Sequence, residues 1–279
     1  MNMTGTIESA ELQFKQILEE FFISVYDEKT LISHGIDHHR RVWNYAKELT
    51  LILADRGLIS DTSLPAKLII ACYLHDIGMS VDPGIMHGHH SRDLCIRFLS
   101  KNHLTDNDNR DLLSAIGNHD KKDYSENTRV NYLLNILSVA DDLDAFGFTG
   151  IFRYSEIYLT RGIKLSEIGY IIKKNADKRF DNFVKTFGFD ELLVEKHKLR
   201  YEILVRFFNE YNNQVIFYKF GEKQPAGFCG VLEILPDLIN NKKVLNDTCM
   251  ETEKFKNDPA IRWFFKGLAN ELNKESKKF

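Results

Sequence analysis

The sequence LIIACYLHDIG, residues 68–78, decides the expected fold. Residues three and four apart are neighbours on a helix surface, and one such face carries Leu68, Ala71, Cys72 and His75. Pro65 is a favoured first helical position, and Gly78 can end the helix. His75 therefore stands at the buried end of an apolar helix, and Asp76 follows it directly. A buried carboxylate beside an imidazole is costly unless it is neutralised, and a cation neutralises it readily.

Helical periodicity dominates the rest of the chain, and strict alternation of apolar and polar residues is rare. Helices are expected near residues 8–26, 37–55, 65–78, 89–101, 107–119, 129–144, 190–211 and 258–275. The strongest late pattern is Leu192, Leu199, Ile203, Phe207 and Tyr211. Residues 212–230 break the periodicity and hold either a short strand and turn or only a loop. The sequence predicts an all-α protein with a core over residues 1–160. A mostly helical C-terminal part, residues 161–279, would pack on that core, with a soft boundary between Gly147 and Gly169.

Composition excludes several classes of function. The chain has 279 residues and a net charge of −3, which gives no electrostatic reason to expect a double-stranded nucleic acid as partner. The longest apolar run, Leu68–Leu74, is far too short for a membrane span. Glu8 and Glu11 fall where a signal peptide needs apolar residues. The four cysteines form no CxxC pair, so a reducing compartment is expected and the sequence predicts a cytoplasmic protein.

Histidines crowd into one part of the chain, because nine of the ten lie between residues 34 and 119. Metal binding is the leading explanation, since imidazole suits several transition metals. In HGIDHHRRVWNYA, residues 34–46, one helix stripe carries His34, His38, Arg41 and Tyr45 if the helix already begins near His34. His39 is rotated by about 100° from this stripe and is expected at the surface. His103 is also expected at the surface, and His197 in a core.

A carboxylate occupies an apolar stripe in NYLLNILSVADDLDAF, residues 131–146. The stripe is Val130, Leu134, Leu137 and Asp141. Asp142 lies off it, and Asp144 is close enough along the helix to support a ligand. A carboxylate in a core stripe is rare without a partner, so Asp141 is a candidate metal ligand.

These segments together resemble the HD superfamily of metal-dependent phosphohydrolases. HHRRV is similar to the family's H-x-x-R-V segment, LHDIG supplies the His-Asp doublet, and ADDLDAFG resembles its A-D-x-L segment. The resemblance covers about residues 30–155 and implies an HD-domain helical bundle. It also implies a metal held by His38, His75, Asp76 and Asp141.

Two further segments are similar to the two-metal branch of the family. MHGHHSRDL, residues 86–94, and LLSAIGNHD, residues 112–120, place His87 and His119 in ligand positions. The resemblance therefore implies two divalent ions (Mn, Fe, Co, Ni, Zn or Mg), with Asp76 shared between them. Either of the neighbouring residues His89 and His90 could replace His87.

The implied activity is hydrolysis of a phosphate ester or nucleotide by a metal-activated water, as a phosphomonoesterase, phosphodiesterase or nucleotidase. Asp76 would bridge the ions, and Arg41 would orient a ligand carboxylate or contact phosphate. His34 would support a ligand or donate a proton to the leaving group.

The chain departs from the family's motifs at two positions. Met79 replaces the lysine of the H-D-I-G-K form, and Arg92 replaces a small residue. A di-iron oxygenase and a non-catalytic nucleotide sensor are the alternatives. The expected partner is a small phosphorylated molecule, and no membrane association is expected. The aromatic C-terminal part could pack in the interface of a homodimer.

Overall fold

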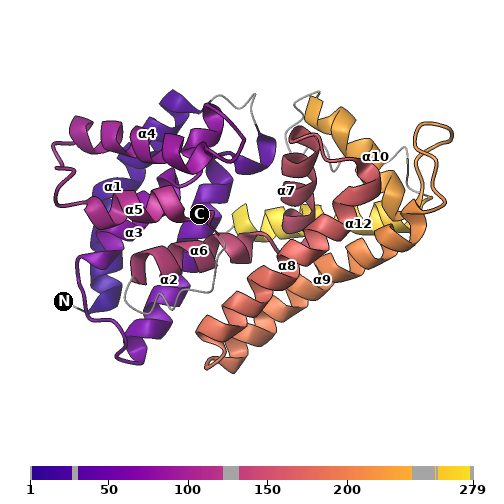
Figure 1. Cartoon of the computed structure of the whole chain (residues 1–279). Coiled ribbons are helices and arrows are strands. Elements are labelled where there is room, and N and C mark those ends of the chain that lie inside the picture. The colour runs from indigo at the N-terminus through magenta and orange to yellow at the C-terminus, as the bar shows by residue number, and fades with distance from the viewer. Residues whose placement is uncertain (1, 27–30, 122–131, 241–254, 256, 277–279) are drawn as a thin grey trace. The chain divides into compact units, whose positions relative to one another are not determined.

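The computed structural model describes residues 2–26, 31–121, 132–240, 255 and 257–276 (Figure 1). The α-helices are α1 Met3–Val25, α2 Ile36–Asp55, α3 Leu64–Leu74, α4 His87–Lys101, α5 Arg110–Asn118, α6 Tyr132–Asp144, α7 Gly147–Thr160, α8 Leu165–Phe187, α9 Glu191–Val215, α10 Gly227–Asn240 and α12 Pro259–Ser276. Two short 3₁₀ turns are η1 Ile32–His34 and η2 Ile77–Ser80. No strand occurs in the described ranges, so the predicted all-α fold is confirmed.

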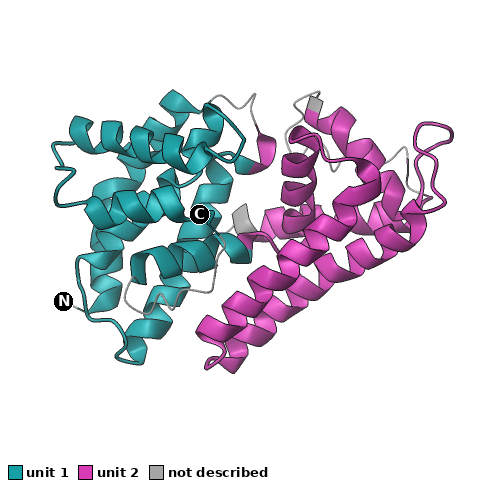
Figure 2. Cartoon of the chain, in the orientation of Figure 1, with its two compact units in different colours: residues 1–30, 34–143 teal, residues 31–33, 144–279 magenta. Residues whose placement is uncertain are grey.

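The chain forms two compact units (Figure 2). Unit 1 comprises residues 1–30 and 34–143, and unit 2 comprises residues 31–33 and 144–279. The change of unit thus falls between Leu143 and Asp144, near the end of α6. The domain ranges 1–160 and 161–279 stay a prediction. No helix in the described ranges combines the length and the apolar character needed to cross a bilayer.

Helix α3 forms the centre of unit 1. It packs against α1, α2 and α5, and every residue from Leu68 to Leu74 is buried. A helix that is apolar on all sides needs such neighbours on all sides. Because α3 ends at Leu74, the residues that follow it, His75 and Asp76, emerge inside the unit rather than at its surface.

Helix α2 begins later than the stripe through His34 requires. Gly35 precedes the first helical residue, Ile36, and His34 belongs to the separate turn η1. The condition for that stripe, a helix that already begins near His34, is therefore not met, whereas the helix predicted over residues 37–55 is confirmed. His34 is nevertheless fully buried, because η1 leads it inward.

Unit 2 is a second helical assembly with its own aromatic core. α8 and α9 are long helices joined by three residues and packed side by side, and α9 also packs against α7 and α10 (Figure 1). Its fully buried rings include Phe183, Phe187, Phe207, Phe208, Phe264 and Phe265. The predicted C-terminal helical character is confirmed for the described residues.

The sequence pattern missed α7, α8 and α10, and it chose the wrong face for part of α9. Leu192 and Leu199 of the predicted stripe are exposed. The buried residues are Leu193, which follows Leu192, and Leu204, which follows Ile203. Of the segment 212–230, residues 212–215 are helical in α9 and residues 227–230 in α10. Between Val215 and Gly227 the chain makes turns and no strand, so the loop alternative holds for this middle part alone.

Candidate metal centre

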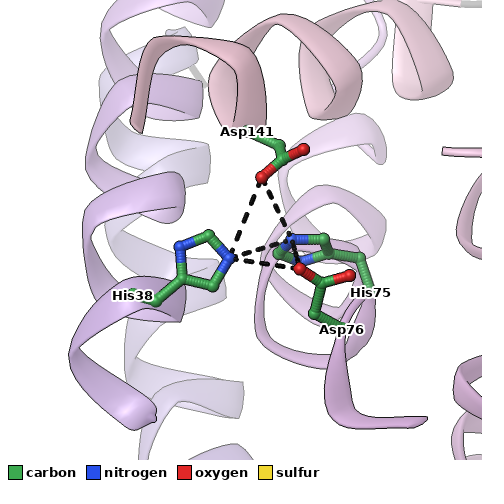
Figure 3. A group of neighbouring side chains, drawn as sticks. All are labelled: His38, His75, Asp76 and Asp141. Atoms are coloured by element: carbon green, nitrogen blue, oxygen red, sulfur yellow. Dashed lines mark hydrogen bonds and ion pairs between the residues drawn. The ribbon is translucent and has the colours of Figure 1, made fainter. Parts of the chain in front are cut away.

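Four side chains from three parts of unit 1 converge on one point (Figure 3). His38 comes from α2, His75 and Asp76 follow the end of α3, and Asp141 comes from α6. The Nε2 atoms of His38 and His75 are 3.3 Å apart, and they lie 3.5 and 3.4 Å from Oδ2 of Asp76. Oδ1 of Asp141 lies 3.9 and 3.8 Å from the same two nitrogens. All four residues are buried.

A second group meets the first at Asp76. Oδ1 of Asp76 is 2.9 Å from Nε2 of His119 and 3.4 Å from Nε2 of His87. His87 is the first residue of α4, and His119 directly follows the last residue of α5. One carboxylate thus turns one oxygen to each group of histidines.

The spacing of these donor atoms fits metal coordination. Two atoms that bind one ion at about 2.1 Å lie about 3.0–3.4 Å from each other. The contacts of Asp76 with His75, His87 and His119, between 2.9 and 3.4 Å, fall in or next to this range. The distances from Oδ1 of Asp141 to the Nε2 atoms of His75 and His38, at 3.8 and 3.9 Å, are longer. A mixed imidazole and carboxylate set suits several divalent ions, so the buried groups could hold one or two of them.

Backbone carbonyl groups orient three of the imidazoles. The Nδ1 atom of His75 lies 3.0 Å from the carbonyl oxygen of Cys72. The corresponding distances are 2.7 Å from His87 to Gly84 and 2.7 Å from His119 to Ile116. A ring that donates its Nδ1 proton to a carbonyl presents an unprotonated Nε2 to a metal. In each case Nε2 is the atom that faces Asp76.

The electrostatics of the site keep Asp76 ionised. Burial would raise the pKa of its carboxyl, but the neighbouring histidines, His75 foremost, hold that pKa well below its ordinary value. Burial likewise would lower the pKa of His75, and Asp76 with Asp141 outweighs this and raises it. The pKa of His87 is raised to about 9, because its contact with Asp76 outweighs burial. The carboxylate charge therefore attracts cations, whether protons or metal ions.

The second group depends on a close approach of α4 to η2. The Gly78 N–H donates to Oγ of Ser91 at 2.8 Å, and a Cβ on Gly78 would meet the His87 carbonyl oxygen at 2.2 Å. Only glycine fits at this point, which explains physically why the doublet is followed by Ile-Gly. Of the three candidate histidines, His87 joins the group, His89 is exposed and His90 is half-buried.

The two predicted catalytic residues outside the groups are also buried. Nε2 of His34 lies 3.9 Å from Oδ2 of Asp76, and its ring centroid is 5.1 Å from that of His38. Arg41, on α2, is 5% exposed. The structure thus places His34 beside the first group, while the ligand and catalytic roles of all these residues stay predictions.

The surface position predicted for His39 is wrong. His39 is fully buried, its Nδ1 lies 3.0 Å from the Cys72 carbonyl oxygen, and its ring packs 4.6 Å from that of Phe22 on α1. α1 covers the face of α2 that the helical phase directed to solvent. His103 is exposed and His197 is buried, as predicted.

Two carboxylates near the site were not singled out from the sequence. Oδ2 of Asp120 lies 3.7 Å from Nε2 of His87, and the Asp120 side chain is 30% exposed. The position of Asp120 directly after His119, a predicted ligand, is the feature of the sequence that could have indicated it. Asp142, assigned to the outside of the stripe, is fully buried beside Asp141 in the sequence. Asp144 is also fully buried, and it forms an ion pair with Arg153 at 3.0 Å.

The fold and the site define an all-α protein with a buried histidine–aspartate metal centre. Residues 35–145 match the family model of the HD domain, and this range includes every member of both groups. The chain therefore contains an HD domain, which is the domain of a superfamily of metal-dependent phosphohydrolases. No curated protein and no solved structure matches the chain.

Proposed function

We propose that the chain is a metal-dependent phosphohydrolase that cleaves a small phosphate ester or a nucleotide. The observation that carries the proposal is the position of Asp76, whose two oxygens face two separate sets of imidazoles. This arrangement supports a pair of divalent ions with one carboxylate between them. The HD domain over residues 35–145 supports the same class of reaction.

His38, His75, Asp76 and Asp141 would hold one ion, and Asp76, His87 and His119 the other. Divalent ions bound there would lower the pKa of water from about 15.7 toward about 7 and offset charge on phosphate oxygens. The Nδ1 contacts of His75, His87 and His119 with backbone carbonyls keep the imidazoles fixed, so little reorganisation accompanies the reaction.

His34 is the candidate proton donor. Its Nε2 lies 3.9 Å from Oδ2 of Asp76 and belongs to neither metal-binding group, so we assign this imidazole the transfer of a proton to a leaving oxygen. Arg41, one turn after His38 on α2, carries the charge suited to a phosphate oxygen or a ligand carboxylate. The substrate's non-reacting part would determine KM.

A direct assay tests the proposal. The purified protein, loaded in turn with Mn²⁺, Co²⁺, Ni²⁺ and Mg²⁺, is given nitrophenyl phosphate, its diester and a nucleotide panel. We expect hydrolysis of at least one substrate, and a loss of about 10³-fold or more in Asp76→Ala because both groups lose their shared oxygen ligand. Asp111→Ala is the matched control, since Asp111 lies on α5, the helix that precedes His119, and pairs with Lys67 in an exposed contact of 2.8 Å.

Two other results would replace the proposal. A silent panel with metal present in the protein would contradict phosphohydrolysis, and tight nucleotide binding without turnover would then indicate a sensor. Oxygen consumption by the iron-loaded protein would indicate a di-iron oxygenase, which uses nearly the same donor set.

A further inference from the structure

Of the three places where the chain passes between the two units, two lie close in the sequence to residues of the candidate metal centre. The first is the bond from Ser33 to His34, and the second is the bond from Leu143 to Asp144 (Figure 2). His34 directly follows the first, and Asp141 stands three residues before Asp144. The backbone position at these two places therefore bears on the geometry of the site.

At the first place, a buried carboxylate binds the backbone. Glu156 on α7 accepts the N–H of Ile32 with Oε1 and the N–H of Ser33 with Oε2, each at 2.8 Å. Glu156 is fully buried and Ser33 is 3% exposed. Glutamate is almost never fully buried without partners, and here both oxygens are used by consecutive peptide groups. The segment Leu31–Ser33 is thus held at two adjacent points, immediately before His34.

At the second place, the same helix supplies a cation. Nη1 of Arg153 lies 3.0 Å from Oδ2 of Asp144, and both side chains are buried. Arg153 precedes Glu156 by three residues, so both project from one face of α7. Burial raises the pKa of Glu156 above its ordinary value, while the bonds from Ser33 and Ile32 and the charge of Arg153 act in the opposite direction. One face of α7 therefore binds residues of unit 2 that lie beside both of these places in the chain.

We propose that Glu156 is a positioning residue for His34. By binding the amides of Ile32 and Ser33, it sets the backbone from which His34 reaches Asp76. A carboxylate in this role is more directional than an apolar side chain, because each oxygen must meet one N–H. Displacement of a catalytic group by about 1 Å can cost about a hundredfold in rate. Only the activity readout below rests on the proposed phosphohydrolase function.

The first test uses the metal-free protein and no activity. We expect the amides of Ile32 and Ser33 to exchange hydrogen as slowly as the interior of α3. In Glu156→Gln the amide nitrogen of the new side chain faces one of these donors, so one bond is lost. That variant should shift the ring resonances of His34, assigned by comparison with His34→Gln. Fast exchange of both amides in the wild type would overturn the inference. Because this measurement uses the wild type, it decides the question even if the variant does not fold.

Glu271→Gln is the matched control. Glu271 on α12 accepts the N–H and Oγ–H of Thr149 on α7 at 2.8 and 3.0 Å, so it makes the same kind of bond to the same helix. The Glu271 contact does not adjoin His34 in the chain. The control should leave the His34 resonances in place, and an equal shift in both variants would show a general loosening of unit 2 and contradict the proposal.

The second test is a double-mutant cycle on turnover. We expect Glu156→Gln to lower kcat about tenfold with KM and metal content unchanged, and to lower it less than about twofold in a His34→Ala background. An equal loss in both backgrounds would show that Glu156 does not act through His34. If the wild type hydrolyses no phosphate ester, the proposed function fails, while exchange and resonance data still decide the positioning role.

Discussion

The two oxygens of Asp76 divide its neighbours into two sets that can be tested separately. Asp141→Ala removes a ligand from the set with His38 and His75 and leaves the other set intact. We expect this variant to retain about one ion per chain, and His119→Ala to do the same through the opposite set. Elemental analysis after dialysis measures both. Loss of all metal in either single variant would show that the sets do not bind independently.

Metal affinity should depend on pH through the histidines. The pKa of His87 is raised to about 9, so a proton occupies its ring at neutral pH in the metal-free protein, and the pKa of His75 is raised as well. A metal ion must displace the proton on His87, so affinity should rise with pH from about 6 toward about 9. Calorimetry in buffers of different ionisation enthalpy should reveal proton release on binding. Binding that is independent of pH across this range would contradict the assignment.

Single residues were predictable where helical phase and burial agree. His38, His75 and Asp141 each lie on an apolar stripe, and the structure buries all three. The phase argument failed for His39, because it assumes that only one face of α2 is covered, whereas Phe22 of α1 packs over the opposite face. Tertiary packing determines which neighbouring helix covers a given face, and the periodicity of one helix carries no information about that packing.

At the scale of elements, the contact between η2 and α4 brings His87 to Asp76. Gly78→Ala would place a Cβ 2.2 Å from the His87 carbonyl oxygen and 2.4 Å from the Ser91 nitrogen. Both are backbone atoms and cannot move without shifting α4. We expect a loss of about 1–3 kcal/mol in the free energy of unfolding, measured by denaturant titration of the metal-free protein. The variant should also lose the ion held by His87.

Gly117→Ala is the control for this substitution. A Cβ on Gly117, inside α5, would meet Arg92 at 3.6 Å, an ordinary contact. Alanine should therefore stabilise α5 by about 0.5–1 kcal/mol through its helix propensity. Equal destabilisation by both substitutions would contradict the special role of Gly78.

Helix existence was predictable where one face of a helix is apolar and the other polar. α7 was missed because residues Gly147–Glu156 are buried without interruption, so no amphipathic period marks the helix. α10 contains Pro236 and two glycines, which are signals of loops and turns. In α9 the apolar pattern that begins with Leu192 and Leu199 competes with a second one, displaced by one residue, that contains Leu193 and Leu204. The residues of the second pattern are the buried ones.

At the scale of the molecule, each unit buries its own core, and the candidate centre lies entirely within unit 1. Within unit 2, Glu156 binds the backbone of Ile32 and Ser33, and Arg153 pairs with Asp144. The homodimer expected from the aromatic C-terminal part stays a prediction, as does the identity of the phosphorylated substrate.

The central claim is that one carboxylate joins two ions, and electron paramagnetic resonance of the Mn²⁺-loaded protein tests it most directly. Two Mn²⁺ ions bridged by Asp76 should give the spectrum of an exchange-coupled pair at about two ions per chain. In Asp76→Ala the coupling should disappear, and the set with His87 and His119 should lose its ion. A wild-type spectrum of isolated Mn²⁺ ions, or one that Asp76→Ala leaves unchanged, would contradict the account.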